Sequence, residues 1–263
     1  MSQRWAIDPD DPRAPPQEVW DQLDEQARRE VVASLPSSIP RAGPPEGDEH
    51  TEPKERSKLT LREFFRRRGR SVYLASELAA YYPGESHFAP DLIAILDVPD
   101  HARQKWVVSD EGRGLDFTLE IHVRGDRHKD YVTNVERYAR LGIPEYFLFD
   151  PPKQRLLGYR RSPASGAYEP VVPQGGLYRS DVLDLDLSLD GGRLQFSPPG
   201  GGALLDPMEW IDKLRTMVDA ATRRAVEEGK RAEEEARRAE ETSQRLERYA
   251  AKLRELGIDP EDL

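Results

Sequence analysis

The strongest constraint on the fold is a strand–helix–strand pattern in the middle of the chain. Residues 116–123 and 144–150 are short apolar runs typical of buried strands. Between them, residues 129–141 carry apolar side chains at helical intervals and lead into Gly142. A parallel pair of strands needs a crossover connection of this kind. The pattern therefore predicts an α/β core in which these two strands are parallel neighbours.

Further apolar runs extend this core into a mixed sheet of the α+β type. Residues 91–98 have the composition of another buried strand. Short runs around glycine-containing turns, at residues 156–161, 168–172, 183–189 and 193–196, are typical of antiparallel strands. Two helices are expected before the core, over about 17–34 and 53–68.

The composition along the chain predicts three parts. Residues 1–45 are expected to be a flexible N-terminal segment with a short helix, because residues 1–16 are polar and rich in proline. Residues 46–198 form the predicted α/β domain. Residues 199–263 are expected to be a glycine-rich hinge followed by a long charged helix.

The last helix carries a seven-residue repeat. Its first row of positions is apolar throughout: Ile211, Val218, Ala225, Ala232, Ala239, Leu246 and Leu253. The second row begins with Leu214 and Ala221, but Glu228, Glu235 and Thr242 interrupt it before Tyr249. A repeat of this kind predicts a coiled coil, and therefore a homo-oligomer formed through the C-terminal helix. The alternative is a solitary helix held by Glu–Arg pairs four residues apart.

Composition excludes several classes of protein. The chain has no cysteine, so disulfides, thiolate catalysis and cysteine-ligated zinc are excluded. It has no apolar run of about 20 residues, so we expect no membrane span and a cytoplasmic location. The net charge of −10 argues against general electrostatic binding of nucleic acid, although local basic patches can still bind it.

Two carboxylates are the best candidates for chemistry. Glu120 and His122 point to one face of a strand, and Leu119 and Ile121 point to the other. Asp91 stands at the start of a neighbouring apolar strand. A buried carboxylate is costly without compensation, and Mg²⁺ prefers oxygen ligands of this kind. The alternative is that Glu120 pairs with an arginine and Asp91 caps a turn. His50, His87 and His101 have no metal-ligand spacing and are expected at the surface.

The order of motifs resembles a known family. Pro90-Asp91, then Glu120-Ile121, then residues 138–146 (Tyr-Ala-Arg-Leu-Gly-Ile-Pro-Glu-Tyr) resemble the bacterial putative restriction endonuclease domain family over about residues 46–196. The resemblance implies a restriction-endonuclease-like core of the PD-(D/E)XK superfamily, in which a central mixed sheet is flanked by helices. It also implies a Mg²⁺- or Mn²⁺-dependent endonuclease that acts on DNA, with Asp91 and Glu120 as the metal ligands.

The chain departs from this family at the position of the active-site lysine. In the broader superfamily the lysine stands two residues after the glutamate, where this chain has His122. In many members of the family it stands in the following helix, four residues before the tyrosine, where this chain has Asn134. Lys129 is the remaining candidate for the positive charge at a phosphate, and His122 could serve as a base or an extra ligand.

Arginines near these motifs are candidates for contacts with nucleic acid. Arg124 and Arg127 follow the proposed site directly, and Arg66 and Arg67 belong to a basic stretch over residues 54–70. Such a stretch can follow a phosphate backbone without recognising sequence. The alternative is a solvated helix face whose arginines meet the acidic C-terminal helix.

Two functions therefore remain open. The first is a metal-dependent endodeoxyribonuclease, a hydrolase in which Asp91, Glu120, Lys129 and His122 perform the reaction. The second is a non-catalytic interaction protein in which the nuclease fold is a scaffold and the C-terminal helix makes the contacts. Retention of both acids favours the first, and the absence of lysine at both usual positions favours the second.

Overall fold

The computed structural model describes residues 5–38 and 47–255, which form parts of two compact units. The first unit ends at Pro207 and the second begins at Met208. The expected boundary between residues 45 and 46 lies outside the described residues.

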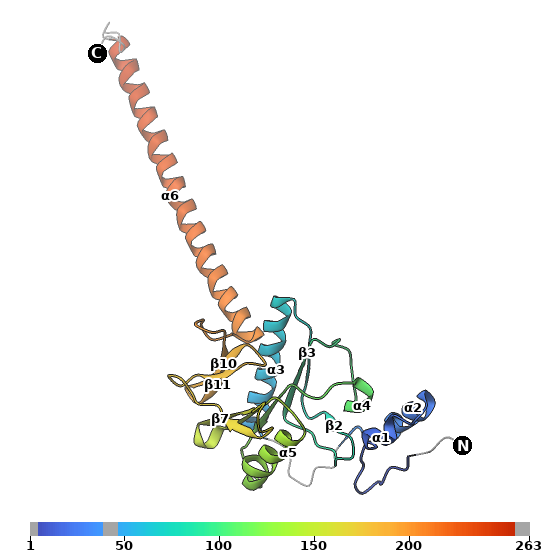
Figure 1. The fold of residues 1–263 in the computed structure, drawn as a ribbon. Helices are drawn as coiled ribbons and strands as arrows, with labels where there is room; N and C mark the ends of the chain where they lie inside the picture. Colours follow the sequence, from blue (N-terminus) through green and yellow to red (C-terminus); the bar gives the residue numbers. More distant parts are fainter. Residues whose placement is uncertain (1–4, 39–46, 256–263) are drawn as a thin grey trace. The chain divides into compact units, whose positions relative to one another are not determined.

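A six-stranded mixed sheet forms the centre of the first unit (Figure 1). Its strands, in spatial order, are β1 (Val72–Ala75), β3 (Leu92–Leu96), β5 (Phe117–Ile121), β6 (Glu145–Asp150), β7 (Arg155–Arg161) and β8 (Tyr168–Pro170). β5 and β6 are parallel, and all other neighbours are antiparallel. The predicted mixed sheet and its parallel pair are therefore confirmed.

The connection between β5 and β6 contains two kinds of helix, one after the other. It begins as a π-helix (Lys129–Thr133) and continues as the α-helix α5 (Asn134–Arg140). The helix expected over residues 129–141 is thus present, but its first turn is wider than an α-helical turn. Gly142 follows with a φ of 77°, a left-handed conformation that glycine adopts without a steric penalty.

One face of the central sheet is covered by α3 (Asp48–Arg68) and by a second sheet, in the order β11 (Arg193–Ser197), β10 (Leu185–Asp190) and β9 (Tyr178–Ser180). Phe65 of α3 packs in one apolar core with Phe117 and Phe147 of the central sheet and Leu185 of β10. α3 begins five residues earlier than expected from Pro53. Asp48 and Glu49 lie in its first turn, where negative charge stabilises a helix.

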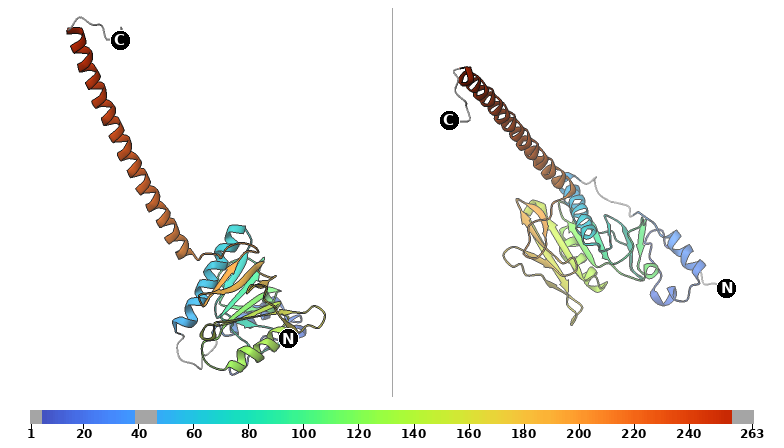
Figure 2. Two further views of the ribbon diagram at one scale, coloured as in Figure 1. Left: turned by 90° about the vertical axis from the view of Figure 1, so that its left-hand side faces the viewer. Right: turned by 90° about the horizontal axis from the view of Figure 1, so that it is seen from above.

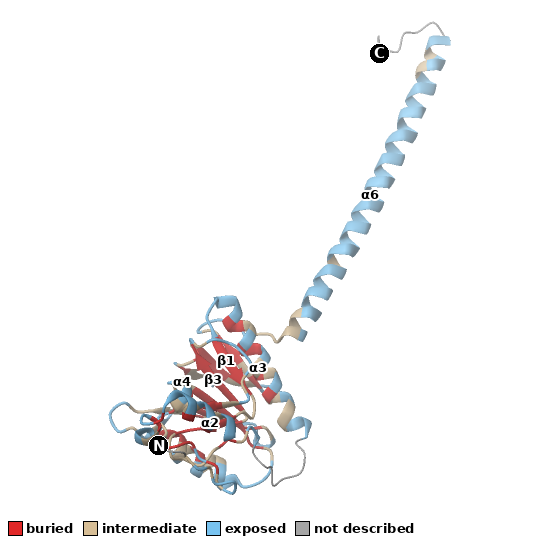
Figure 3. Cartoon of the chain, turned by 90° about the vertical axis from the view of Figure 1, so that its right-hand side faces the viewer, coloured by how far each residue is buried: buried red, intermediate tan, exposed pale blue. Residues whose placement is uncertain are grey.

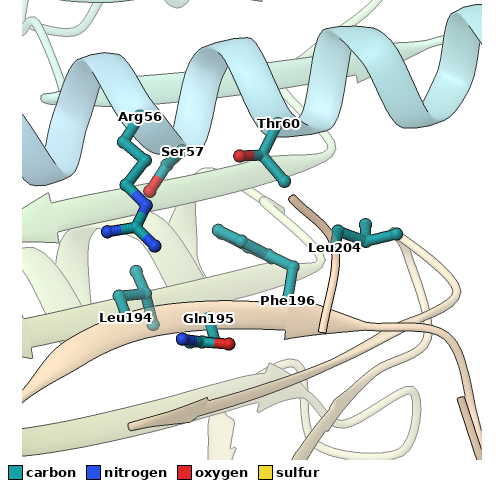
Figure 4. Close-up of a pocket in the computed structure, with 7 residues that line it drawn as sticks. All are labelled: Arg56, Ser57, Thr60, Leu194, Gln195, Phe196 and Leu204. Carbon is teal, nitrogen blue, oxygen red and sulfur yellow. The ribbon is translucent and has the colours of Figure 1, made fainter. Parts of the chain in front are cut away.

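α3 packs closely on the second sheet. Figure 4 shows the residues of α3 that face β11 and the segment after it: Arg56, Ser57 and Thr60 opposite Leu194, Gln195, Phe196 and Leu204. The cavity between them is only about 10 Å³, which is room for about one water molecule. This interface is therefore structural packing and has no space for a ligand.

The other face of the sheet carries α5 and a small parallel sheet of β2 (Ala79–Tyr81) and β4 (Lys105–Val107), followed by the single turn α4 (Val108–Glu111). These short strands are a third layer, on which the N-terminal segment lies (Figure 2). Trp106 is fully buried against this face, as expected for a strand residue.

The N-terminal segment contains two helices where one was expected. They are α1 (Gln17–Trp20) and α2 (Glu25–Ser34). The break occurs because the side chain of Asp24 accepts a hydrogen bond of 2.8 Å from the Ala27 N–H and so starts a new helix. The expectation for this segment was a flexible tail with a short helix. In the structure, Trp20 and Val31 pack in a core with Tyr81 of β2.

The described part of the second unit, residues 208–255, belongs to one helix, α6 (Pro207–Glu255), of 49 residues. Figure 3 shows that it is almost wholly exposed, and none of its described residues is buried. Despite its length, α6 is too strongly charged to cross a membrane, and no other helix among the described residues could do so.

We expect Gly158→Ala in β7 to destabilise the first unit. A Cβ at this position would lie 2.7 Å from Cε1 of Phe147 and 3.1 Å from Cβ of Val171. Overpacking of this kind costs about 1–3 kcal/mol, and urea denaturation followed by circular dichroism would measure it. Gly202→Ala is the control, because nothing lies within 4 Å of the added methyl group. An unchanged free energy of unfolding in Gly158→Ala would contradict the tight β6–β7 contact.

Candidate active site

Asp91 and Glu120 meet at one end of the antiparallel pair β3–β5. The backbone N–H of Ile121 donates a 2.7 Å hydrogen bond to Oδ2 of Asp91. In return, the backbone N–H of Asp91 lies 3.3 Å from Oε2 of Glu120. Pairing of Leu92 with Leu119 holds the two acids in this position. The structure thus brings together the two carboxylates singled out in the sequence.

Glu120 lies on the face of the sheet that α5 covers. The hydroxyl of Tyr138 donates a 2.6 Å hydrogen bond to Oε1 of Glu120, and Nδ2 of Asn134 lies 3.4 Å from the same oxygen. Both partners are uncharged, and Glu120 is only 4% exposed. No arginine pairs with Glu120 in the described part of the chain, so the sequence alternative of a Glu120–arginine pair does not hold.

The pKa of Glu120 is raised well above its ordinary value, first because the side chain is buried and next because the charge of Asp91 is close. Lys129 opposes this shift, whereas Asp130 adds to it. Negative charge is therefore concentrated at this end of the sheet with incomplete compensation by the protein.

His122 and Asp130 form a second pair beside the acids. Nδ1 of His122 lies 2.8 Å from Oδ2 of Asp130, and both side chains are largely buried. His122 follows Glu120 by two residues and so shares its face of the sheet. The ring also contacts Tyr131 edge-on, at 5.7 Å between centroids. These contacts fix the orientation of the imidazole.

Lys129 lies at the rim of the site. Its Nζ is 3.8 Å from Oδ1 of Asp130, and 62% of its side chain is exposed. Asn134 stands where the resemblance implies a lysine; it is buried, and its Nδ2 lies 3.4 Å from Oε1 of Glu120 and 3.3 Å from Oδ1 of Asp130. Lys129 thus contacts Asp130 alone, whereas Asn134 contacts both Glu120 and Asp130.

His50 is a residue of this site that sequence analysis missed. Its Nε2 lies 3.1 Å from Oδ2 of Asp91, and only 14% of its side chain is exposed. The expectation of a surface histidine was wrong. His50 is in the first turn of α3 and 41 residues from Asp91 in the chain, so no local spacing could reveal the contact.

α3 also supports the turn that carries Asp91. Lys54, one helical turn after His50, is buried and forms an ion pair with Glu77. The backbone N–H of Glu77 donates a 3.0 Å hydrogen bond to the carbonyl of Pro90. Glu77 has a φ of 55°, an uncommon conformation for a residue with a side chain. The Lys54–Glu77 pair therefore helps to hold the residue before Asp91.

The four arginines proposed to contact nucleic acid fall into two groups. Arg124 and Arg127 are exposed in the loop beside the site, and Arg127 stacks on Tyr131 at 4.4 Å. Arg66 and Arg67 both pair with Glu63, whose pKa they lower to about 2. They follow His50 by 16 or more residues in α3, about 24 Å along the helix at 1.5 Å per residue. The structure therefore does not bring Arg66 and Arg67 to the acids.

The side chains around Asp91 and Glu120 bear on the metal ion that the sequence implies. Among residues 5–38 and 47–255, no three side chains of His, Cys, Asp or Glu are arranged to hold a metal ion. The two carboxylates nevertheless suit Mg²⁺ or Mn²⁺, because Mg²⁺ commonly binds through one or two carboxylates and retains several waters. A second feature that fits a cation is the burial of Glu120 beside Asp91, with only uncharged side chains as its hydrogen-bonding partners.

A larger cavity of about 220 Å³ lies elsewhere. It is lined by residues of α3, of the β10–β11 turn and of the segment after β6, including Arg56, Phe149, Pro151 and Arg193. Phe149 belongs to the core under α3, on the face opposite Glu120. This cavity is therefore separate from the acidic centre.

Three comparisons with known proteins complete the description. The comparison with curated proteins gave no match. Among solved structures, a crystal structure described as a putative nuclease from Anabaena variabilis is similar, with 17% sequence identity and a TM-score of 0.47. The match covers 60% of this chain and 93% of that one. Residues 20–195 match the family model Uma2, described as putative restriction endonuclease. Because this match spans more than half of the chain, the protein belongs to the Uma2 family.

Proposed function

We propose that this chain is a metal-dependent endonuclease that hydrolyses phosphodiester bonds of DNA at Asp91 and Glu120. The observation that carries the proposal is the meeting of two carboxylates, one of them buried, at the end of adjacent strands. Membership of the Uma2 family supports the same reaction class. The alternative is an interaction protein with an inactive nuclease fold, favoured by Asn134 at the family's lysine position.

Asp91 and Glu120 would hold Mg²⁺ or Mn²⁺. Bound there, the ion would polarise the phosphodiester and favour ionisation of a coordinated water. It would also offset the charge of Glu120, whose hydrogen-bonding partners Tyr138 and Asn134 are neutral.

The other residues of the site would accept the proton of the attacking water, offset the charge of the phosphate and hold the DNA strand. Held by Asp130, the imidazole of His122 would accept a proton from the attacking water. Lys129 would offset the negative charge that builds on the phosphate. Arg124 and Arg127 would hold neighbouring phosphates of the strand.

The first test is cleavage of supercoiled plasmid and single-stranded DNA in Mg²⁺ and in Mn²⁺. Asp91→Asn and Glu120→Gln should lower the rate by at least about 100-fold, because each removes a charged ligand. Asp97→Asn is the matched control: Asp97 follows the same strand β3 at its other end and pairs with Arg70. Nuclease function is ruled out if the wild type is inert with both metals, or if the Asp91 and Glu120 variants cleave as fast as Asp97→Asn.

Metal binding can be tested without activity. Added Mn²⁺ should raise the melting temperature of the wild type, because an ion that binds only the folded state stabilises it. In chelator, Glu120→Gln should melt at a higher temperature than the wild type, because the substitution removes a buried charge close to Asp91. The gain in the free energy of unfolding should be on the order of 1 kcal/mol. The same variant should show little response to Mn²⁺. An equal Mn²⁺ response in the wild type and Glu120→Gln would show that the ion binds elsewhere.

The third test places a lysine at position 134, where the resemblance implies one. Nδ2 of Asn134 lies within 3.4 Å of Glu120 and 3.3 Å of Asp130, so an ammonium group there would reach both acids. We expect Asn134→Lys to increase DNA cleavage by about 10-fold or more, since it adds a charge where the phosphate would react. Asn134→Met, similar in length but uncharged, is the control. Equal rates for the two variants would mean that positive charge at residue 134 does not limit the reaction.

The C-terminal helix supports a second part of the proposal. We propose that α6 joins two copies of the chain, whichever activity the first unit has. Its repeat of apolar residues is exposed along the helix: Ile211 is 41% exposed and Leu246 is 63% exposed. Large apolar side chains in a regular row on one face are typical of a helix that packs on another. Pairs such as Arg237–Glu241, at 3.8 Å, also stabilise the isolated helix.

A further inference from the structure

Within the two rows of the seven-residue repeat, the exposed large apolar side chains of α6 lie near its two ends. The first group contains Ile211, Leu214 and Val218, and the second contains Leu246 and Tyr249. All are between 41% and 63% exposed. The groups lie in the same two rows of the seven-residue repeat, so they face one side of the helix.

The middle of these rows has a different composition. Ala225, Ala232 and Ala239 occupy the first row, whereas Glu228 and Glu235 occupy the second. Alanine adds little apolar contact, and each glutamate brings a charge into the contact surface. The orientation of a partner helix is therefore decided by what faces Glu228 and Glu235.

A parallel pair in register would place like charges together. Each residue of the two rows would face its own copy, so Glu228 would meet Glu228 and Glu235 would meet Glu235 at the centre of the contact. Like charges brought together and partly desolvated are destabilising. The apolar ends would then have to offset two layers of repulsion.

An antiparallel pair avoids this repulsion. When Leu214 of one helix faces Leu246 of the other, Ile211 faces Tyr249 and Val218 faces Thr242. In the middle of the same alignment, Glu228 faces Ala232 and Glu235 faces Ala225. A glutamate opposite alanine can lay its methylene groups over the small side chain and keep its carboxylate in water.

We propose that α6 pairs with α6 of a second copy in the antiparallel orientation, with Leu214 of one chain opposite Leu246 of the other. This inference rests on the proposed self-association of the chain, to which it adds the orientation and the register. The seam from Ile211 to Tyr249 is about 57 Å long at 1.5 Å per residue. The alignment places large apolar layers at both ends of this seam and like-charge layers nowhere within it.

The absence of cysteine in the native chain allows a direct test. Sedimentation of the full chain first measures its mass in solution. Single-cysteine variants Leu214→Cys and Leu246→Cys are then oxidised separately and as an equal mixture. A disulfide needs Cα atoms about 4.4–6.8 Å apart, so only facing residues should cross-link. Thr216→Cys, on the outer side of the same turn, is the control for random cross-linking.

If the pair is antiparallel, the chain is a dimer in sedimentation and the mixture of Leu214→Cys and Leu246→Cys forms disulfide-linked dimers. Their yield should be at least about 10-fold higher than with either variant alone. Self-linking of each single variant would show a parallel pair, which would overturn the orientation and leave self-association intact. A dimer without any cross-link, or with cross-links equal to those of Thr216→Cys, would also overturn the orientation. A monomer in sedimentation would overturn self-association itself.

Discussion

The candidate site depends on the antiparallel pairing of β3 with β5. This pairing brings the start of one strand to the end of the other. The carboxylate of Asp91 therefore accepts a hydrogen bond from the Ile121 N–H, and that of Glu120 accepts one from the Asp91 N–H. Two carboxylates in one place repel each other, and their backbone contacts oppose that repulsion. The neighbouring elements adjust to this centre: His50 of α3 reaches Asp91 from one side, and Tyr138 of α5 reaches Glu120 from the other.

The charge of the centre depends on the residue at position 134. Where the resemblance implies a lysine, Asn134 supplies an amide that bonds both Glu120 and Asp130. An amide satisfies hydrogen bonds but leaves the charge in place. Burial of Glu120 and then the nearby charge of Asp91 raise the pKa of Glu120, and Lys129 opposes this from the rim. The negative charge of such a site is offset when a cation binds, when a proton binds, or when the covering helix moves away and admits water. A nuclease would bind a cation.

The parts of the fold that sequence could predict are those set by local periodicity. The β5–α5–β6 unit, the strand after Asp91 and the long α6 all have clear patterns over many residues. The three-residue strands β2 and β4 are too short to show alternation and are built by packing against the N-terminal helices. The two acids were predictable because charge is unusual on a buried strand. His50 was not, since its role arises from a tertiary contact across 41 residues. The place of Arg66 and Arg67 relative to the acids was also not predictable, because it depends on how α3 lies on the sheet. Both arginines pair with Glu63, three or four residues away in the same helix.

The wide helical turn at Lys129–Thr133 has a consequence for how this site can vary. A π-helical turn holds one more residue than an α-helical turn, and such turns are frequent at functional sites. The helix on either side of such a turn keeps its phase, so loss of one residue there would restore a regular helix without turning α5 on the sheet. Lys129 and Asp130 lie within the turn, so their side chains, and with them the contact between Asp130 and His122, would move while Tyr138 stayed on Glu120. A deletion of one residue in this turn would therefore separate Asp130 from His122 and leave the two carboxylates on the sheet in place.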